Sequence, residues 1–178
     1  MQRNNPHREE RESKQWDAVE EGVALLEDRQ FEAGLLELKK VVEADPNNAY
    51  AYNLIGKALW EIGKIEPARD AFKASVLLSP NFLGARIALS HAQRRLGEAS
   101  LAEREARIAI SRFPDDGEAY HALGLALAAQ GERDEARECL NRFLATKPEF
   151  EIATEVRGVL AMLDEGQEGE GLDVEEDD

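Results

Sequence analysis

The prolines of this chain recur at one fixed interval. Four of them are spaced 34 residues apart, at Pro46, Pro80, Pro114 and Pro148. Glycines follow the same interval at Gly22, Gly56 and Gly124, with Ser90 in the missing step, and a second column holds Gly63, Gly97 and Gly131. Columns of different residue types that share one period indicate a structural repeat, in which neighbouring copies stack to build the core.

Each block of the repeat reads as two helices. Apolar residues recur at steps of three and four, as at Leu54, Ala58 and Ile62, which places them on one face of a helix. The second glycine column follows the first helix, where a left-handed backbone ends it. The prolines end the second helix because they lack an N–H group. The sequence therefore predicts a helix, a tight turn and a second helix per block.

The predicted fold class is an all-α solenoid, an α-α superhelix of four helix-turn-helix repeats with a ninth, capping helix. The helices are expected at 16–28 and 32–45, 50–62 and 66–78, 84–96 and 100–113, 118–130 and 134–146, and about 149–164. The expected organisation is a polar N-terminal extension (1–14), repeats at 15–48, 49–82, 83–116 and 117–148, a capping helix (149–163) and a tail (164–178). The tail has nine acids and no base, which predicts disorder.

The charge balance limits the partners. The chain has 37 Asp and Glu against 22 Lys and Arg, for a net charge of −15. Binding to nucleic acid or an anionic membrane needs surface cations, so neither is expected as a partner. The sequence shows no transmembrane stretch, and its polar first 14 residues lack the apolar segment of a secretory signal. With one cysteine, Cys139, these features favour a cytoplasmic protein.

The repeat resembles the tetratricopeptide repeat. The second block is most similar, with Tyr52, Ile55, Gly56, Leu59, Gly63, Ala68, Phe72 and Pro80, and the fourth has Tyr120, Leu123, Gly124, Leu127, Gly131, Ala136, Leu140 and Pro148. The first and third blocks depart from the pattern, notably at Arg29 and Arg86. The resemblance covers about residues 15–148. It implies a right-handed superhelix whose inner surface, lined by the first helices, binds peptides or helices of partner proteins.

The resemblance also implies which residues would face a partner, namely first-helix residues that the packing columns leave unused. These are Trp16, Val19, Val23, Tyr50, Asn53, Lys57, Trp60, Ile87, His91, Arg94, His121 and Leu125. Both tryptophans belong to this set, and no acidic residue does. We expect the aromatic residues to anchor apolar side chains, and Lys57 and Arg94 to hold a carboxylate. The alternative is that Trp16 and Trp60 fill gaps between hairpins.

One binding mode of similar repeats does not fit this sequence. Repeats that hold the free carboxylate at the end of heat-shock chaperones use Lys and Asn on the first helix, Asn on the third, and Lys and Arg on the fifth. The matching positions here hold Val19, Val23, Leu54, Gly84 and Ala88. The resemblance therefore implies an amphipathic helix or an extended apolar segment as the ligand.

The sequence lacks the motifs of an enzyme. It has neither the phosphate-binding G-x-x-x-x-G-K-[ST] nor the zinc-binding H-E-x-x-H, and two histidines, His91 and His121, are too few to hold a metal. We expect no catalysis, cofactor or metal. The leading expectation is an adaptor or scaffold that binds a protein segment in its concave groove. The alternative is a small acidic chaperone for a secreted or assembled client, and self-association is also open.

Overall fold

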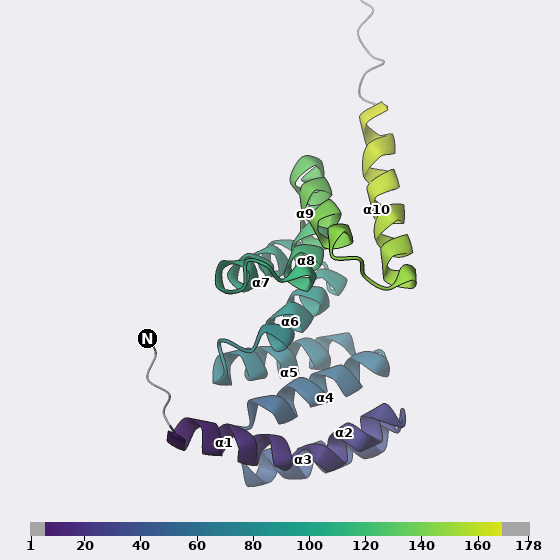
Figure 1. Cartoon of the computed structure of the whole chain (residues 1–178). Coiled ribbons are helices and arrows are strands. Elements are labelled where there is room, and N and C mark those ends of the chain that lie inside the picture. Colours follow the sequence, from purple (N-terminus) through teal and green to yellow (C-terminus); the bar gives the residue numbers. More distant parts are fainter. Residues whose placement is uncertain (1–5, 169–178) are drawn as a thin grey trace, which may run out of the picture.

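The helices of this chain stack in antiparallel pairs along a curved path (Figure 1). The computed structural model describes residues 6–168, and these form ten α-helices without a strand. They are α1 (Pro6–Asp17), α2 (Glu20–Glu27), α3 (Phe31–Ala44), α4 (Ala49–Glu61), α5 (Ile65–Leu78), α6 (Leu83–Arg95), α7 (Ala99–Arg112), α8 (Gly117–Ala128), α9 (Arg133–Ala145) and α10 (Phe150–Glu168). The predicted all-α solenoid is confirmed. No helix of this described part is long and apolar enough to cross a membrane.

The turn inside each hairpin adopts the left-handed backbone that its glycine permits. The φ angles of Gly63, Gly97 and Gly131 are 76°, 78° and 80°. The first hairpin has Arg29 at this step of the repeat, and its φ of 58° shows that the turn is kept without glycine. From α3 to α9 the helix ends agree with the predicted ones within two residues.

The first glycine column lets the two helices of a hairpin approach each other closely. A Cβ atom at Gly56 would lie 2.5 Å from Cε1 of Phe72, so the phenyl ring takes the space of the missing side chain. Gly124 meets Leu140 of α9 in the same way. In the third hairpin Ser90 replaces glycine, and its hydroxyl donates a hydrogen bond of 2.8 Å to the carbonyl of Ala102. The period is therefore a packing rule within each hairpin.

Both ends of the described chain differ from the prediction. A single helix was expected at 16–28, but α1 starts at Pro6 and ends at Asp17, and α2 starts at Glu20. Hydrogen bonds from Gln15 Nε2 to Asp45 and to the carbonyl of Asn47 hold α1 against the turn after α3. At the other end α10 continues to Glu168. The remainder of the predicted acidic tail, 169–178, lies outside the described residues, as does 1–5.

Candidate partner-binding groove

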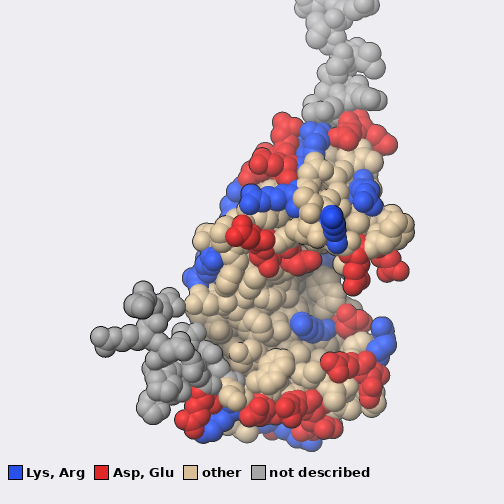
Figure 2. All heavy atoms as spheres, viewed as in Figure 1, with Lys and Arg blue, Asp and Glu red and all other residues tan. Residues whose placement is uncertain are grey.

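The first helices of the hairpins and α10 enclose a cavity of about 970 Å³ on the concave side. Figure 2 shows this side as a hollow of mostly uncharged residues between charged rims. In Figure 1 the helices that line it, α2, α4, α6, α8 and α10, follow one another along the curved stack, with α2 and α10 toward its two ends. The lining residues are Val23, Leu26, Glu27, Arg29, Phe31, Leu54, Lys57, Ala58, Trp60, Glu61, Phe72, Ala88, His91, Arg94, Arg95, His121, Leu125, Glu155, Val156 and Val159.

One row of the lining crosses all five helices. It consists of Val23, Lys57, His91, Leu125 and Val159, one residue each from α2, α4, α6, α8 and α10, and successive members are 34 residues apart in sequence. Equivalent positions of stacked repeats face the same side, which explains the spacing. The row is polar in its middle and apolar at both ends.

Beside the polar middle lie two arginines with different surroundings. The guanidinium of Arg95 lies over the ring of Trp60, with 5.4 Å between its carbon and the ring centroid. Arg94 is half-buried, and its Nε atom is shielded from solvent with no hydrogen-bond partner among the described residues. Burial, together with the charge of Arg95, lowers the pKa of Arg94. The groove thus contains a cation that no nearby acid neutralises.

Two histidines continue the groove from α6 to α8. The rings of His91 and His121 have centroids 5.4 Å apart, and His121 stacks on the buried Phe143 of α9 at 4.4 Å. Burial, reinforced by His121 and Arg94, lowers the pKa of His91 to about 4, so this ring is neutral at pH 7. In the described part of the chain no three potential ligands from His, Cys, Asp and Glu gather into a metal site.

Comparison with known proteins decides the family. Two models of the tetratricopeptide repeat match residues 19–81 and 117–150, together more than half of the chain. The chain belongs to the tetratricopeptide repeat family. The fold of this family is a non-catalytic one that mediates protein–protein interactions.

Relatives and solved structures agree with this membership. Tetratricopeptide repeat protein 33 of Xenopus laevis is 30% identical over 101 residues, which is 57% of this chain and 39% of that protein. The chain therefore spans about two fifths of that relative. The crystal structure of MamA has a TM-score of 0.72 at 27% identity and covers 82% of this chain and 84% of its own. The first tetratricopeptide domain of Spaghetti (RPAP3), bound to an HSP90 peptide, shares the fold with a TM-score of 0.58 at 24% identity, over 65% of this chain and 93% of its own.

Within this tetratricopeptide groove the structure brings together seven of the twelve residues predicted from sequence. They are Val23, Lys57, Trp60, His91, Arg94, His121 and Leu125. Trp16 and Tyr50 lie elsewhere, in a row of aromatic rings that continues to Phe82, with centroids 5.5 and 5.3 Å apart. The aromatic residues of the N-terminal repeats thus form two groups, and Trp60 belongs to the groove together with Phe31 and Phe72.

Three predicted groove residues face neighbouring hairpins. Val19 has no exposed surface and packs in a core cluster with Leu54 of α4, so a partner cannot contact it. Asn53 is only 4% exposed, and Ile87 packs against the core of the last hairpin. The prediction was wrong for Val19 and Asn53 because their positions, one turn before the row through Lys57, are buried.

The sequence prediction also missed acidic residues in the groove. Glu27, Glu61 and Glu155 line it, although no acid was assigned to this surface. It missed Val159 as well, because α10 was treated only as a cap. The 34-residue spacing contained the signal, since Val159 follows Leu125 at that interval. The last helix therefore caps the core and completes the groove.

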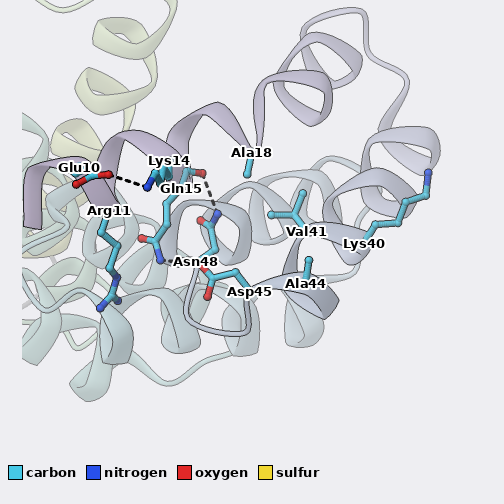
Figure 3. Close-up of a pocket in the computed structure, with 10 residues that line it drawn as sticks. All are labelled: Glu10, Arg11, Lys14, Gln15, Ala18, Lys40, Val41, Ala44, Asp45 and Asn48. Atoms are coloured by element: carbon cyan, nitrogen blue, oxygen red, sulfur yellow. Dashed lines mark hydrogen bonds and ion pairs between the residues drawn. The ribbon is translucent and has the colours of Figure 1, made fainter. Parts of the chain in front are cut away.

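A second hollow, of about 650 Å³, lies between α1 and α3 (Figure 3). Several of its polar side chains are hydrogen-bonded: Asn48 donates a 2.8 Å hydrogen bond to the carbonyl of Gln15, and Gln15 donates one of 2.9 Å to Asp45. Lys14 pairs with Glu10 at 2.8 Å. Because these groups already have partners, the contacts account for the docking of α1.

Proposed function

We propose that this chain is an adaptor or scaffold that holds one segment of a partner protein, a peptide or an amphipathic helix, in the concave groove. The observation that carries the proposal is the cavity of about 970 Å³ to which the four first helices and α10 all contribute. Its apolar residues lie next to the half-buried Trp60, and buried aromatic anchors contribute much of the binding free energy at protein interfaces.

Two further observations support this function. The Spaghetti (RPAP3) domain, which shares the fold, is bound to a peptide of HSP90. In this chain Val19, Val23 and Leu54 are apolar where terminal-carboxylate binders of the family have Lys and Asn, so the ligand chemistry differs. The free, buried thiol of Cys139 fits a reducing compartment, which supports the proposal of a cytoplasmic location.

The test compares partner capture by matched variants. The full-length chain, the double variant Trp60→Ala with Lys57→Ala, and Arg104→Gln on the outer helix α7 are each used to isolate proteins from the source cells. We expect partners that bind the unchanged chain and Arg104→Gln but not the double variant. Circular dichroism checks that all three remain helical. Equal capture by all three would contradict a role for the groove.

A persistence assay separates the adaptor from the chaperone alternative. An adaptor remains in one complex with two proteins at once, whereas a chaperone co-purifies with one client and releases it on assembly. Sedimentation of the purified chain tests self-association. Two proteins recovered together through the groove support the adaptor.

A further inference from the structure

Arg94 differs from other arginines of this chain that are removed from solvent. Arg86 pairs with Glu105, Arg69 contacts Asp70 and Glu98, and Arg137 contacts Asp134 and Asp164. Arg94 is half-buried in the groove, and none of the described acidic residues forms an ion pair with it. This happens in a chain whose net charge is −15, where acids are abundant.

A partly buried cation without a counter-ion destabilises the folded state, because it loses hydration without gaining an ion pair. The pKa of Arg94 is lowered mainly by burial, which is consistent with this loss of hydration. The neighbouring side chains do not compensate: Arg95 adds positive charge, and His91 is neutral. A ligand that brings a negative charge to this point gains an ion pair that residues 6–168 do not supply.

We propose that the groove binds a segment with an acidic side chain, held by Arg94, and large apolar residues on both sides of it. The proposal rests on the proposed function and names the chemistry of its partner. Lys57 on α4 supplies a second, exposed cation beside this point. The apolar neighbours of the partner contact Val23 and Leu26 on one side, and Leu125 and Val159 on the other.

The dimensions of the repeat define the spacing of such a motif. Packed helices lie about 8–10 Å apart, and an extended chain advances about 3.3 Å per residue. A segment that crosses the first helices therefore moves by roughly three residues from one helix to the next. The apolar anchors are then about three to six residues from the acid on either side.

The acids of the groove strengthen the selectivity for this arrangement. Glu27, from α2, and Glu155, from α10, line the cavity near its two apolar ends, and Glu61 lies on α4 one turn after Lys57. An acidic residue of the ligand at either end meets like charge, whereas at the middle the three cations Lys57, Arg94 and Arg95 outnumber Glu61. Such repulsion at wrong positions sets the register of a bound chain.

The experiment uses random 15-residue peptides, displayed with their carboxyl ends fused to a carrier, and selects binders of the full-length chain. Selected peptides are then synthesised with the acid and with Gln in its place, each with an amidated end. The charge-assisted hydrogen bonds of Arg94 should make the Gln peptide about 10–100-fold weaker. The chain with Arg104→Gln should show the same ratio, and the chain with Arg94→Gln a ratio below about threefold.

Any other result contradicts either the inference about Arg94 alone or the proposed function as well. Peptides that lose binding in the Trp60→Ala, Lys57→Ala variant but contain no acid would overturn this inference and leave the proposed function intact. The inference is also overturned if replacing the acid of the peptide by Gln weakens binding to the Arg94→Gln chain as much as it weakens binding to the unchanged chain. If no selected peptide depends on Trp60 and Lys57, the proposed function fails and the inference with it. Thermal melting confirms that the Arg94→Gln chain is folded.

Discussion

The imidazole rings of His91 and His121 lie 5.4 Å apart and join α6 to α8 across the groove. His121 also lies 3.6 Å from Glu118 through its Nδ1 atom, and it stacks on Phe143. The groups that act on His91 are thus His121 and Glu118 from α8 and Arg94 from its own helix. Burial, His121 and Arg94 lower the pKa of His91, whereas Glu118 raises it.

This arrangement predicts a pH dependence of stability. The pKa of His91 falls from 6.5 to about 4 on folding. Between these pH values the unfolded chain binds a proton at His91 and the folded chain does not. The neutral, buried His91 therefore costs no stability above pH 6.5, and the free energy of unfolding decreases as the pH falls from 6.5 toward about 4. Urea unfolding should therefore show a smaller loss of stability between pH 7 and pH 4.5 for His91→Asn than for the unchanged chain. Equal losses would contradict a buried, neutral His91.

Removal of the unpaired charge at Arg94 should stabilise the protein. Arg94→Met replaces a cation that forms no ion pair within residues 6–168 by an apolar side chain, and we expect a gain of about 0.5–2 kcal/mol in the free energy of unfolding. The matched variant Arg86→Met breaks the buried ion pair with Glu105 and should lose about 3–5 kcal/mol. Denaturant titration measures both. A loss at Arg94 as large as that at Arg86 would show that Arg94 supports the fold.

Two glycines of one sequence column should respond oppositely to alanine. At Gly56 the added methyl group meets Phe72, which is 2% exposed, and overpacking of this kind costs about 1–3 kcal/mol. At Gly158 a Cβ atom meets nothing within 4 Å, so alanine should stabilise α10 by about 0.5–1 kcal/mol through its helix propensity. Melting temperatures of the two variants check this, and a fall in both would contradict an open face at Gly158.

Removal of α10 should destabilise the last hairpin. Val156 and Leu163 of this helix are buried in one cluster with Phe143 of α9, and Asp164 accepts hydrogen bonds from Arg137. A chain that ends at Lys147 leaves this cluster open to water and should melt at lower temperature and aggregate more readily. A chain that ends at Glu168 is the control and should match the full-length chain. Unchanged melting of the shorter chain would refute the capping role.

The helix boundaries in the middle of the chain were predictable because each signal acts within a few residues. Gly63 ends a helix through its own backbone angle, and the side chain of Asn48 caps α4 by accepting a hydrogen bond from the N–H group of Ala51. The start of α1 was not predictable in this way. Its segment is polar, and what holds it is the pairing of Gln15 with Asp45, 30 residues away.

The sequence by itself determined the helix pairs, their stacking and the row that runs from Val23 to Val159, because one 34-residue period controls all three. Only the tertiary structure decided that α10 closes the groove, that Val19 is buried and that Arg94 forms no ion pair with an acid of residues 6–168. The physical reason is range. A periodic pattern defines which face a helix buries, whereas the angle between stacked hairpins, which depends on packing between residues far apart in sequence, decides which side chains meet.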